Sequence, residues 1–217
     1  IGSQEVNIKE IEADFKKLAA TPNAYMGFSG DATDNWTLSL PLGVHEQLLS
    51  PSASRKIFRY LISLVKDKML FMVHGCHDNF SITNDDYNMI EEIAIDYKIP
   101  YLGYGGKLHL FCNEDVVYNI TCWHKRSGSS VNNIFQPCIS TLKNYDMDND
   151  VVAVAHNHTS GISMQTVQER DRVFIRTSTY KNIDRFAKKI GYAELTNQDQ
   201  PRIIPCVLFN TQNKEMR

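Results

Sequence analysis

Val151 to Gly161, VVAVAHNHTSG, is the stretch that decides the fold of this chain. Its first five residues are small and apolar, which is typical of a buried strand. His156 and His158 follow where the strand gives way to a Ser/Gly turn, the usual place for a site on an α/β scaffold. Side chains at i and i+2 of an extended segment point the same way, so both imidazoles are expected to face one cleft. Imidazole is the commonest metal-binding side chain, and the alternative is a pair of solvent-facing turn histidines.

Length and composition set the limits around this stretch. The chain has 217 residues, which suits one large domain or one domain with a small extension. Because the sequence from Asn210 is polar, we expect the domain to cover residues 1–209 and a polar tail to cover 210–217. A net charge of -2 gives no global drive toward nucleic acid or an anionic membrane. The apolar run Met69 to Val73 is far too short to span a bilayer. Five cysteines without a CxxC pair indicate the reduced thiols of a cytoplasmic protein.

Outward from the opening stretch, hydrophobic periodicity predicts alternating helices and strands in the first half. The expected helices are Val6–Ala20, a segment from Ser50 or Ser52 to Val65, and one that starts at Thr83–Asp86 and ends before Pro100. The expected strands are Ala24–Phe28 and Met69–Val73. This alternation is an α/β signature with a parallel sheet.

The second half is richer in strands. We expect strands at Leu108–Cys112, Val116–Trp123, Val173–Arg176 and Ile203–Phe209, a partly helical Val131–Tyr145, and a short helix at Asp184–Ile190. Polar clusters follow four of the apolar strands: Gly30-Asp31, Gly75-Cys76-His77-Asp78, Trp123-His124 and His156-Asn157-His158. In a parallel sheet such strand ends converge on one edge, where sites are built.

These clusters, in this order, resemble the blocks of the calcineurin-like metallophosphoesterase family, which carries D-x-H, G-D-x-x-D, G-N-H-D/E, a lone His and G-H-x-H. Gly30 to Asp34 matches the second block, and Gly75 to Asp78 matches the third except at Cys76. His124 matches the lone His, and Ala155 to His158 matches the fifth block with Ala for the usual Gly. The segments around Trp123 to Ser130 and Gly103 to Gly106 look most like phage and bacterial members.

The first block is absent. Relatives often follow it with Leu-Gly or Ile-Gly and then a helix, and this chain opens Ile1-Gly2-Ser3 before a helix. We therefore expect the chain to be cut just after a missing D-x-H, without the first strand. The resemblance then implies a weakly active or inactive fragment.

The resemblance implies a four-layer α/β/β/α sandwich of two mixed sheets and a centre with two divalent metal ions. One metal would take Asp31, Cys76, His124 and His156. The other would take Asp31, His158 and the missing residues of the first block.

His77 would protonate the leaving oxygen, and Asp78 would orient it, since a His held by a carboxylate is a sensible general acid near neutral pH. Asp34 more readily braces its loop than binds metal. Arg126 could contact the substrate phosphate, although a solvated surface side chain is the alternative.

Cys76 departs from the family pattern, in which a neutral amide oxygen stands at this position. A thiolate ligand would favour Zn²⁺ or Fe²⁺ over Mn²⁺. The alternative is that Cys76 packs against the sheet.

We therefore expect a metal-dependent phosphoester hydrolase, of the phosphodiesterase or nuclease-like kind, with a phosphoester partner that could be nucleic acid and no membrane partner. A phosphomonoesterase acting on a protein or metabolite is the first alternative. A non-catalytic binding module that retains the fold is the second.

Overall fold

The computed structural model describes residues 1–2, 6–35, 47–128, 130, 132–145, 147–181 and 204–216. The chain divides into two compact units, and each is described by itself. The first unit contains Ile1–Tyr101 and Thr179–Arg202, and the second contains Leu102–Ser178 and Ile203–Arg217. Both units therefore combine pieces that are far apart in the sequence. The boundaries of a single domain at 1–209 stay a prediction.

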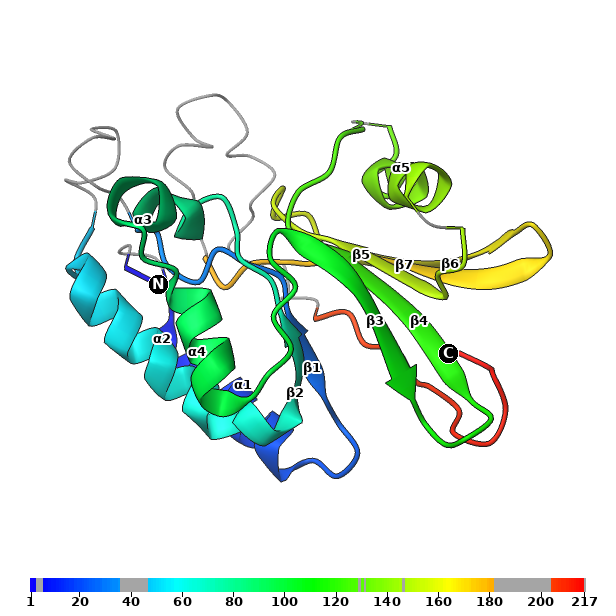
Figure 1. The fold of residues 1–217 in the computed structure, drawn as a ribbon, viewed down its shortest axis with the longest axis horizontal. Helices are drawn as coiled ribbons and strands as arrows, with labels where there is room; N and C mark the ends of the chain where they lie inside the picture. The colour runs from blue at the N-terminus through cyan, green and yellow to red at the C-terminus, as the bar shows by residue number, and fades with distance from the viewer. Residues whose placement is uncertain are drawn as a thin grey trace. The chain divides into compact units, whose positions relative to one another are not determined.

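The first unit packs helices against a short parallel sheet (Figure 1). Its elements are α1 (Ile8–Ala20), β1 (Met26–Phe28), α2 (Pro51–Val65), the 3-10 helix η2 (Lys66–Lys68), β2 (Met69–Met72), α3 (Asp78–Asp85) and α4 (Met89–Tyr97). The two strands pair in parallel, with Met26 opposite Met69 and Phe28 opposite Met72. Their carboxyl ends therefore lie at the same edge, as the sequence predicts.

The helices of this unit begin where the sequence supplies a cap. The Ser50 side chain accepts a hydrogen bond from the backbone N–H of Ala53, and Pro51 occupies the first turn of α2. The helix then buries an apolar face that includes Leu61 and Ile62. Most of the stability of such a helix comes from this packing.

The prediction that a helix starts at Thr83–Asp86 is wrong. These residues instead end α3, where Asp86 adopts a left-handed conformation with φ of 51°. The following helix, α4, begins later because the Asn88 side chain caps it by accepting from the Glu91 backbone N–H. The sequence Thr83-Asn84-Asp85-Asp86 has cap-forming residues, and here they serve a helix end.

The second unit contains a five-stranded sheet in the order β3-β4-β5-β7-β6. Its elements are β3 (Gly105–Phe111), β4 (Val117–Trp123), α5 (Gln136–Asn144), β5 (Val151–Val154), β6 (Gly161–Val167) and β7 (Arg170–Arg176). The three central strands run parallel, and the two edge strands pair antiparallel to their neighbours. All four residues of β5 are buried, which confirms that the apolar run of the opening stretch is a central strand.

The helix α5 covers one face of this sheet (Figure 1). Cys138 and Leu142 of the helix pack against Val152 and Val154 of β5 and against Phe174 of β7. All five side chains are at most 1% exposed. This small core fixes the central parallel strands, whose carboxyl ends carry His124, His156 and Arg176.

The strand β6 does not appear among the sequence expectations. Burial alternates along the strand, but the apolar Ile162 and Met164 lie on its exposed side, at 44% and 47%, and the polar Ser163 and Gln165 lie on its less exposed side. Backbone pairing with β7 along seven residue pairs, from Gly161–Arg176 to Val167–Arg170, holds it in place. Tertiary pairing, rather than local pattern, defines this edge.

The C-terminal segment is more ordered than the expected polar tail. The predicted strand Ile203–Phe209 is not formed over its described residues, and Phe209 makes an isolated bridge to Met216. The Phe209 ring lies 4.7 Å from the ring of buried Tyr118. The Tyr118 hydroxyl also lies within hydrogen-bonding distance, 2.8–3.0 Å, of the carbonyl oxygens of Asn210, Asn213 and Glu215. The helix expected at Asp184–Ile190 lies outside the described residues.

The α/β class with two sheets flanked by helices is confirmed. Over the described residues, the first sheet contains only parallel pairing and the second is mixed. The stacking of the two sheets in four layers stays a prediction, as does a missing first strand. No helix in the described part of the chain is long and apolar enough to cross a membrane.

Candidate functional site

In the first unit, the loops after β1 and β2 interlock at Asp31 and Gly75. A Cβ added at Gly75 would lie 2.1 Å from Asp31 Oδ1 and 2.3 Å from the Asp31 backbone nitrogen. No side chain fits at that separation, so the Gly of the third block allows the two loops to touch. Asp31 Oδ1 also accepts a hydrogen bond of 2.8 Å from the His77 backbone N–H.

The carboxylate of Asp78 ties the same loops together. It is buried, and it accepts hydrogen bonds from the backbone N–H groups of Asp31, Ala32 and Gly75 at 2.9, 3.2 and 2.8 Å. Charge-assisted bonds of this kind are stronger than those between neutral groups. Asp78 therefore positions the backbone that presents Asp31, a role that sequence reasoning did not assign to it.

The His77 ring is oriented by a backbone carbonyl. His77 Nδ1 lies 2.8 Å from the carbonyl oxygen of Asp34. A carbonyl oxygen can only accept, so Nδ1 carries the proton and donates it to Asp34, and proton transfer to a substrate would take place at the other ring nitrogen, Nε2. This geometry suits a general acid at Nε2. The expectation that Asp78 orients the ring stays a prediction.

Asn35 braces the loop, whereas Asp34 contributes a backbone carbonyl that contacts His77 and a side chain that pairs with Lys181, so the bracing role of the Asp34 side chain stays a prediction. The Asn35 side chain donates to the His77 carbonyl at 2.9 Å and exchanges hydrogen bonds with the Ser81 hydroxyl. Asp34 Oδ1 lies 3.4 Å from the Lys181 ammonium. Cys76, in the same loop as Gly75 and His77, is half-buried and forms no disulfide.

In the second unit, the ends of β4 and β5 bring His124 and His156 together. These strands are parallel neighbours, with Trp123 opposite Val154. His124 is buried, and its Nε2 lies 3.2 Å from Nδ1 of His156. The planes of the two rings are inclined at 77°, with their centroids 5.2 Å apart. Two histidines 32 positions apart in sequence thus bring their ring nitrogens within hydrogen-bonding distance of each other.

This pair fits a shared metal ion. Imidazole nitrogens bind Zn²⁺ at about 2.0–2.1 Å, and tetrahedral angles then place two such nitrogens about 3.3–3.4 Å apart. The observed 3.2 Å is close to that separation. The donor set is also suitable, because imidazole is a common ligand of Zn²⁺, Fe²⁺ and related ions.

The prediction that His156 and His158 lie on one extended segment is wrong. The strand ends at Val154, and both histidines adopt left-handed backbone conformations with φ of 76° and 54°. The alternation rule for extended segments therefore does not apply to them. His156 is half-buried and lines a pocket, whereas His158 is exposed. Non-glycine residues in this backbone region carry a conformational cost and often occur at functional sites.

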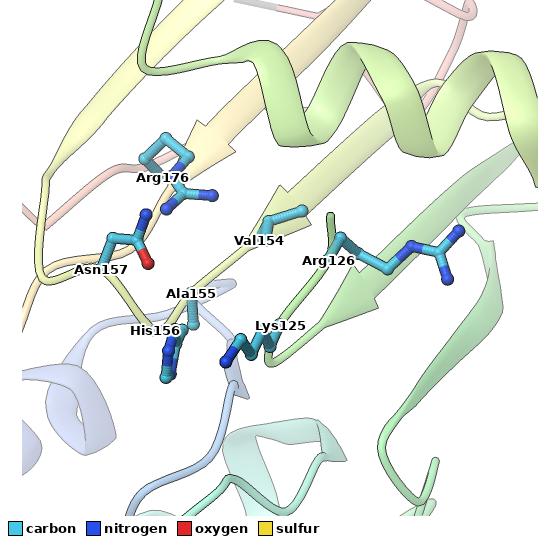
Figure 2. Close-up of a pocket in the computed structure, with 7 residues that line it drawn as sticks. All are labelled: Lys125, Arg126, Val154, Ala155, His156, Asn157 and Arg176. Carbon is cyan, nitrogen blue, oxygen red and sulfur yellow. The ribbon is translucent and has the colours of Figure 1, made fainter. Parts of the chain in front are cut away.

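A small pocket of about 180 Å³, including its open mouth, lies beside His156. It is lined by Lys125, Arg126, Val154, Ala155, His156, Asn157 and Arg176 (Figure 2). Three of these residues are cationic and none is acidic, so the pocket carries a positive charge. The Arg126 guanidinium lies 4.6 Å from the centre of the Trp123 ring and 5.9 Å from that of Tyr145, so cation–π contacts hold it.

Arg176, at the end of β7, is the residue of this pocket that sequence reasoning missed. Although it is a basic residue at the end of a strand, it is only 2% exposed. Burial lowers the pKa of its guanidinium, and the neighbouring Cys138 raises it. Burial in turn raises the pKa of the Cys138 thiol to about 11. A hint existed in the sequence, because Arg176 directly continues the apolar run Val173-Phe174-Ile175.

No protein-family model and no curated protein matches the chain. Among solved structures, the chain is similar to the sulfate thiohydrolase SoxB of Thermus thermophilus in complex with glycerol, with 12% identity and a TM-score of 0.44. The match covers 84% of this chain and 39% of the SoxB chain. The functional proposal below therefore rests on the residues and the geometry of each unit.

Proposed function

We propose that this chain is a metal-dependent phosphoester hydrolase of the calcineurin-like metallophosphoesterase type, acting on phosphodiesters. The observation that carries the proposal is the pair His124 Nε2 and His156 Nδ1, 3.2 Å apart at the ends of adjacent parallel strands. The interlocked loops of the first unit, which hold Asp31 beside the backbone of His77, add support.

The proposed metal ligands come from four strand ends: Asp31, Cys76, His124, His156 and His158. Two divalent ions, Mn²⁺, Zn²⁺ or Fe²⁺, would supply an activated water and offset charge on the phosphoryl oxygens. A dinuclear centre needs ligands beyond those five, in the position of the family's first block.

His77 is the proposed general acid. The Asp34 carbonyl holds the proton on Nδ1, so the proton given to the leaving oxygen would come from Nε2. Asp78 would act one step away, because its carboxylate fixes the loop that carries both His77 and Asp31.

The proposed substrate class is a phosphodiester, which includes nucleic acid. A net charge of -2 provides no general attraction to a polyanion. Attraction would be local, from Lys125, Arg126 and Arg176 around the pocket. A cytoplasmic location also belongs to the proposal.

Metal binding is the first test. The protein is stripped with a chelator, exchanged into metal-free buffer, and titrated separately with Mn²⁺, Zn²⁺ and Fe²⁺ under reducing conditions. We expect His124→Gln and His156→Asn to weaken binding at least about a hundredfold, because metal sites lose 10–100-fold even when a residue behind a ligand is removed. His109→Gln is the matched control, since this exposed histidine pairs with Asn119 on β4. Equal metal affinity in all four proteins would contradict the proposal.

Substrate preference is the second test. Hydrolysis of bis-p-nitrophenyl phosphate is compared with hydrolysis of p-nitrophenyl phosphate by the same metal-loaded sample. We expect the diester to be cleaved faster, and the ratio of the two rates does not depend on how much activity the chain retains. Monoester preference would favour a phosphatase, and metal binding without either activity would favour a binding module.

A further inference from the structure

We propose that the pocket beside His156 is a phosphate-binding subsite, anchored by Arg176, that holds the phosphate of the ester substrate. The proposal deepens the proposed function, on which it rests for the identity of the molecule that carries the phosphate. All the residues that line this pocket belong to the second unit.

The Arg176 guanidinium has buried hydrogen-bond donors. Its Nε and Nη1 are buried and make no hydrogen bond of good geometry to a described residue, and the neutral Cys138 thiol, a weak acceptor, is the neighbour that favours its charge. A buried cation with unpaired donors is costly. The contrast with Arg172 on the same strand is sharp, because that buried guanidinium donates to the carbonyl oxygens of Asn149 and Val167.

The Arg176 and Arg126 side chains extend in different directions. Arg176 lines the pocket, and Figure 2 shows its guanidinium turned toward Asn157, whereas the Arg126 side chain extends the other way. Arg126 is thus held over Trp123, and Arg176 is the guanidinium that supplies donors to the pocket. An oxyanion there would satisfy two N–H groups of one planar guanidinium, the geometry that arginine prefers for phosphate.

The other side chains that line the pocket also favour an anion. The exposed Lys125 adds a second positive charge at the mouth, and the Asn157 side chain offers an amide. No carboxylate lines the pocket to compete for the guanidinium.

The geometry also gives Arg176 a fixed place. Its backbone pairs with Val154 of β5 on one side and Gly161 of β6 on the other, so its Cα is held at the carboxyl end of β7. A phosphate bound there would lie next to His156, which is one of the proposed metal ligands. Arg176 would therefore select for a phosphate ester at the pocket, independently of any metal ion.

The test is calorimetric titration of the whole chain with inorganic phosphate and, separately, with bis-p-nitrophenyl phosphate, in buffer containing a chelator so that no metal holds the anion. We expect both to bind, and we expect Arg176→Gln to raise the Kd at least about tenfold, the loss that follows removal of hydrogen bonds to a charged group. Lys125→Gln should raise it about threefold. Lys143→Gln removes an exposed charge from α5 of the same unit and should leave it unchanged.

Arg176→Gln could fail to fold, so a second measurement uses the unaltered protein. The Nε–Hε signal of Arg176 is followed by NMR during the phosphate titration, and we expect it to shift while that of Arg172 does not. An unshifted signal, or equal phosphate affinity in folded Arg176→Gln, would show a purely structural arginine and overturn the proposal. Binding of inorganic phosphate with exclusion of the diester would overturn the assignment to substrate. Loss of metal binding with phosphate binding intact would instead count against the proposed function.

Discussion

Gly75 and Asp31 touch so closely that a methyl group at position 75 would lie 2.1 Å from the Asp31 carboxylate. The contact joins two loops 44 positions apart, each following a strand of the same parallel pair. Because Asp31 is a proposed metal ligand, this contact links backbone packing to the position of a ligand.

Replacement of Gly75 by Ala should therefore disturb both stability and the site. We expect the free energy of unfolding to fall by about 1–3 kcal/mol, the usual cost of forcing atoms into a packed region. Metal affinity should fall with it, because the loop must move away from Asp31. Urea unfolding and metal titration measure the two effects.

Gly106→Ala is the matched control for this change, because its Cβ would meet its nearest neighbour, Leu102 Cβ, at an ordinary 3.4 Å. A Gly75→Ala variant as stable as Gly106→Ala would show that the two loops can separate freely.

Asp78→Asn should destabilise the same loops without changing their shape. The carboxylate accepts from three backbone N–H groups, and the amide oxygen that replaces it is neutral and has fewer acceptor positions. We expect a loss of about 1.5–3 kcal/mol in the free energy of unfolding. Asp67→Asn, at a carboxylate that is 88% exposed, should change it by far less. Equal values for the two variants would remove the bracing role of Asp78.

Cys76→Asn should change which metal ion binds. If the thiolate is a ligand, its replacement by a neutral amide oxygen shifts preference from Zn²⁺ toward Mn²⁺. We expect the ratio of the Zn²⁺ affinity to the Mn²⁺ affinity to fall at least about tenfold. Cys206→Ser, at an exposed thiol, is the control. An unchanged ratio would place Cys76 in packing alone.

Cys122 should react very slowly with thiol reagents in the folded protein. Burial raises the pKa of its thiol from 9.0 to about 12, so the reactive thiolate is about a thousandfold less populated below pH 9. Iodoacetamide at pH 8, with mass spectrometry, should modify the exposed Cys206 long before Cys122. Modification of both at similar rates would mean that β4 opens readily.

The same pKa shift predicts the direction of a pH effect on stability. The folded state keeps the Cys122 proton at pH values where the unfolded chain releases it, so its contribution is complete below about pH 9 and declines as pH rises toward 12. One group contributes about 1.4 kcal/mol per pH unit in that window. Between pH 9 and 10, Cys122→Ala should therefore lose about 1 kcal/mol less unfolding free energy than the original protein. Parallel losses in both proteins would contradict the assignment.

Sequence reasoning predicted the fold where local chemistry decides it. Ser50 and Pro51 mark the start of α2, and the run Val151–Val154 gives the buried central strand. It failed where distant contacts decide. Strand β6 was not predicted: its apolar residues Ile162 and Met164 are exposed, and backbone pairing with β7 holds the strand in place.

Some features of the candidate site are predictable from the sequence, and others depend on the folded structure. The residue types that carry chemistry, such as His124 and His156, are evident from their positions after strands. The left-handed backbone at His156 and the burial of Arg176 are not, because both depend on packing that forms only in the folded unit. The residue pair His77 and Asp34 shows a related limit, since its contact uses a backbone carbonyl that no side-chain pattern reveals.

The contacts of Tyr118 set an order of events during synthesis. Its hydroxyl lies against the Glu215 carbonyl, 97 residues further along the chain. At about 5–20 residues per second, a ribosome needs roughly 5–20 s to make that interval. During this time the surface around Tyr118, fully buried in the finished unit, has no C-terminal segment to cover it. The second unit can therefore complete its fold only after Glu215 has been made, and until then the aromatic surface around Tyr118 stays uncovered.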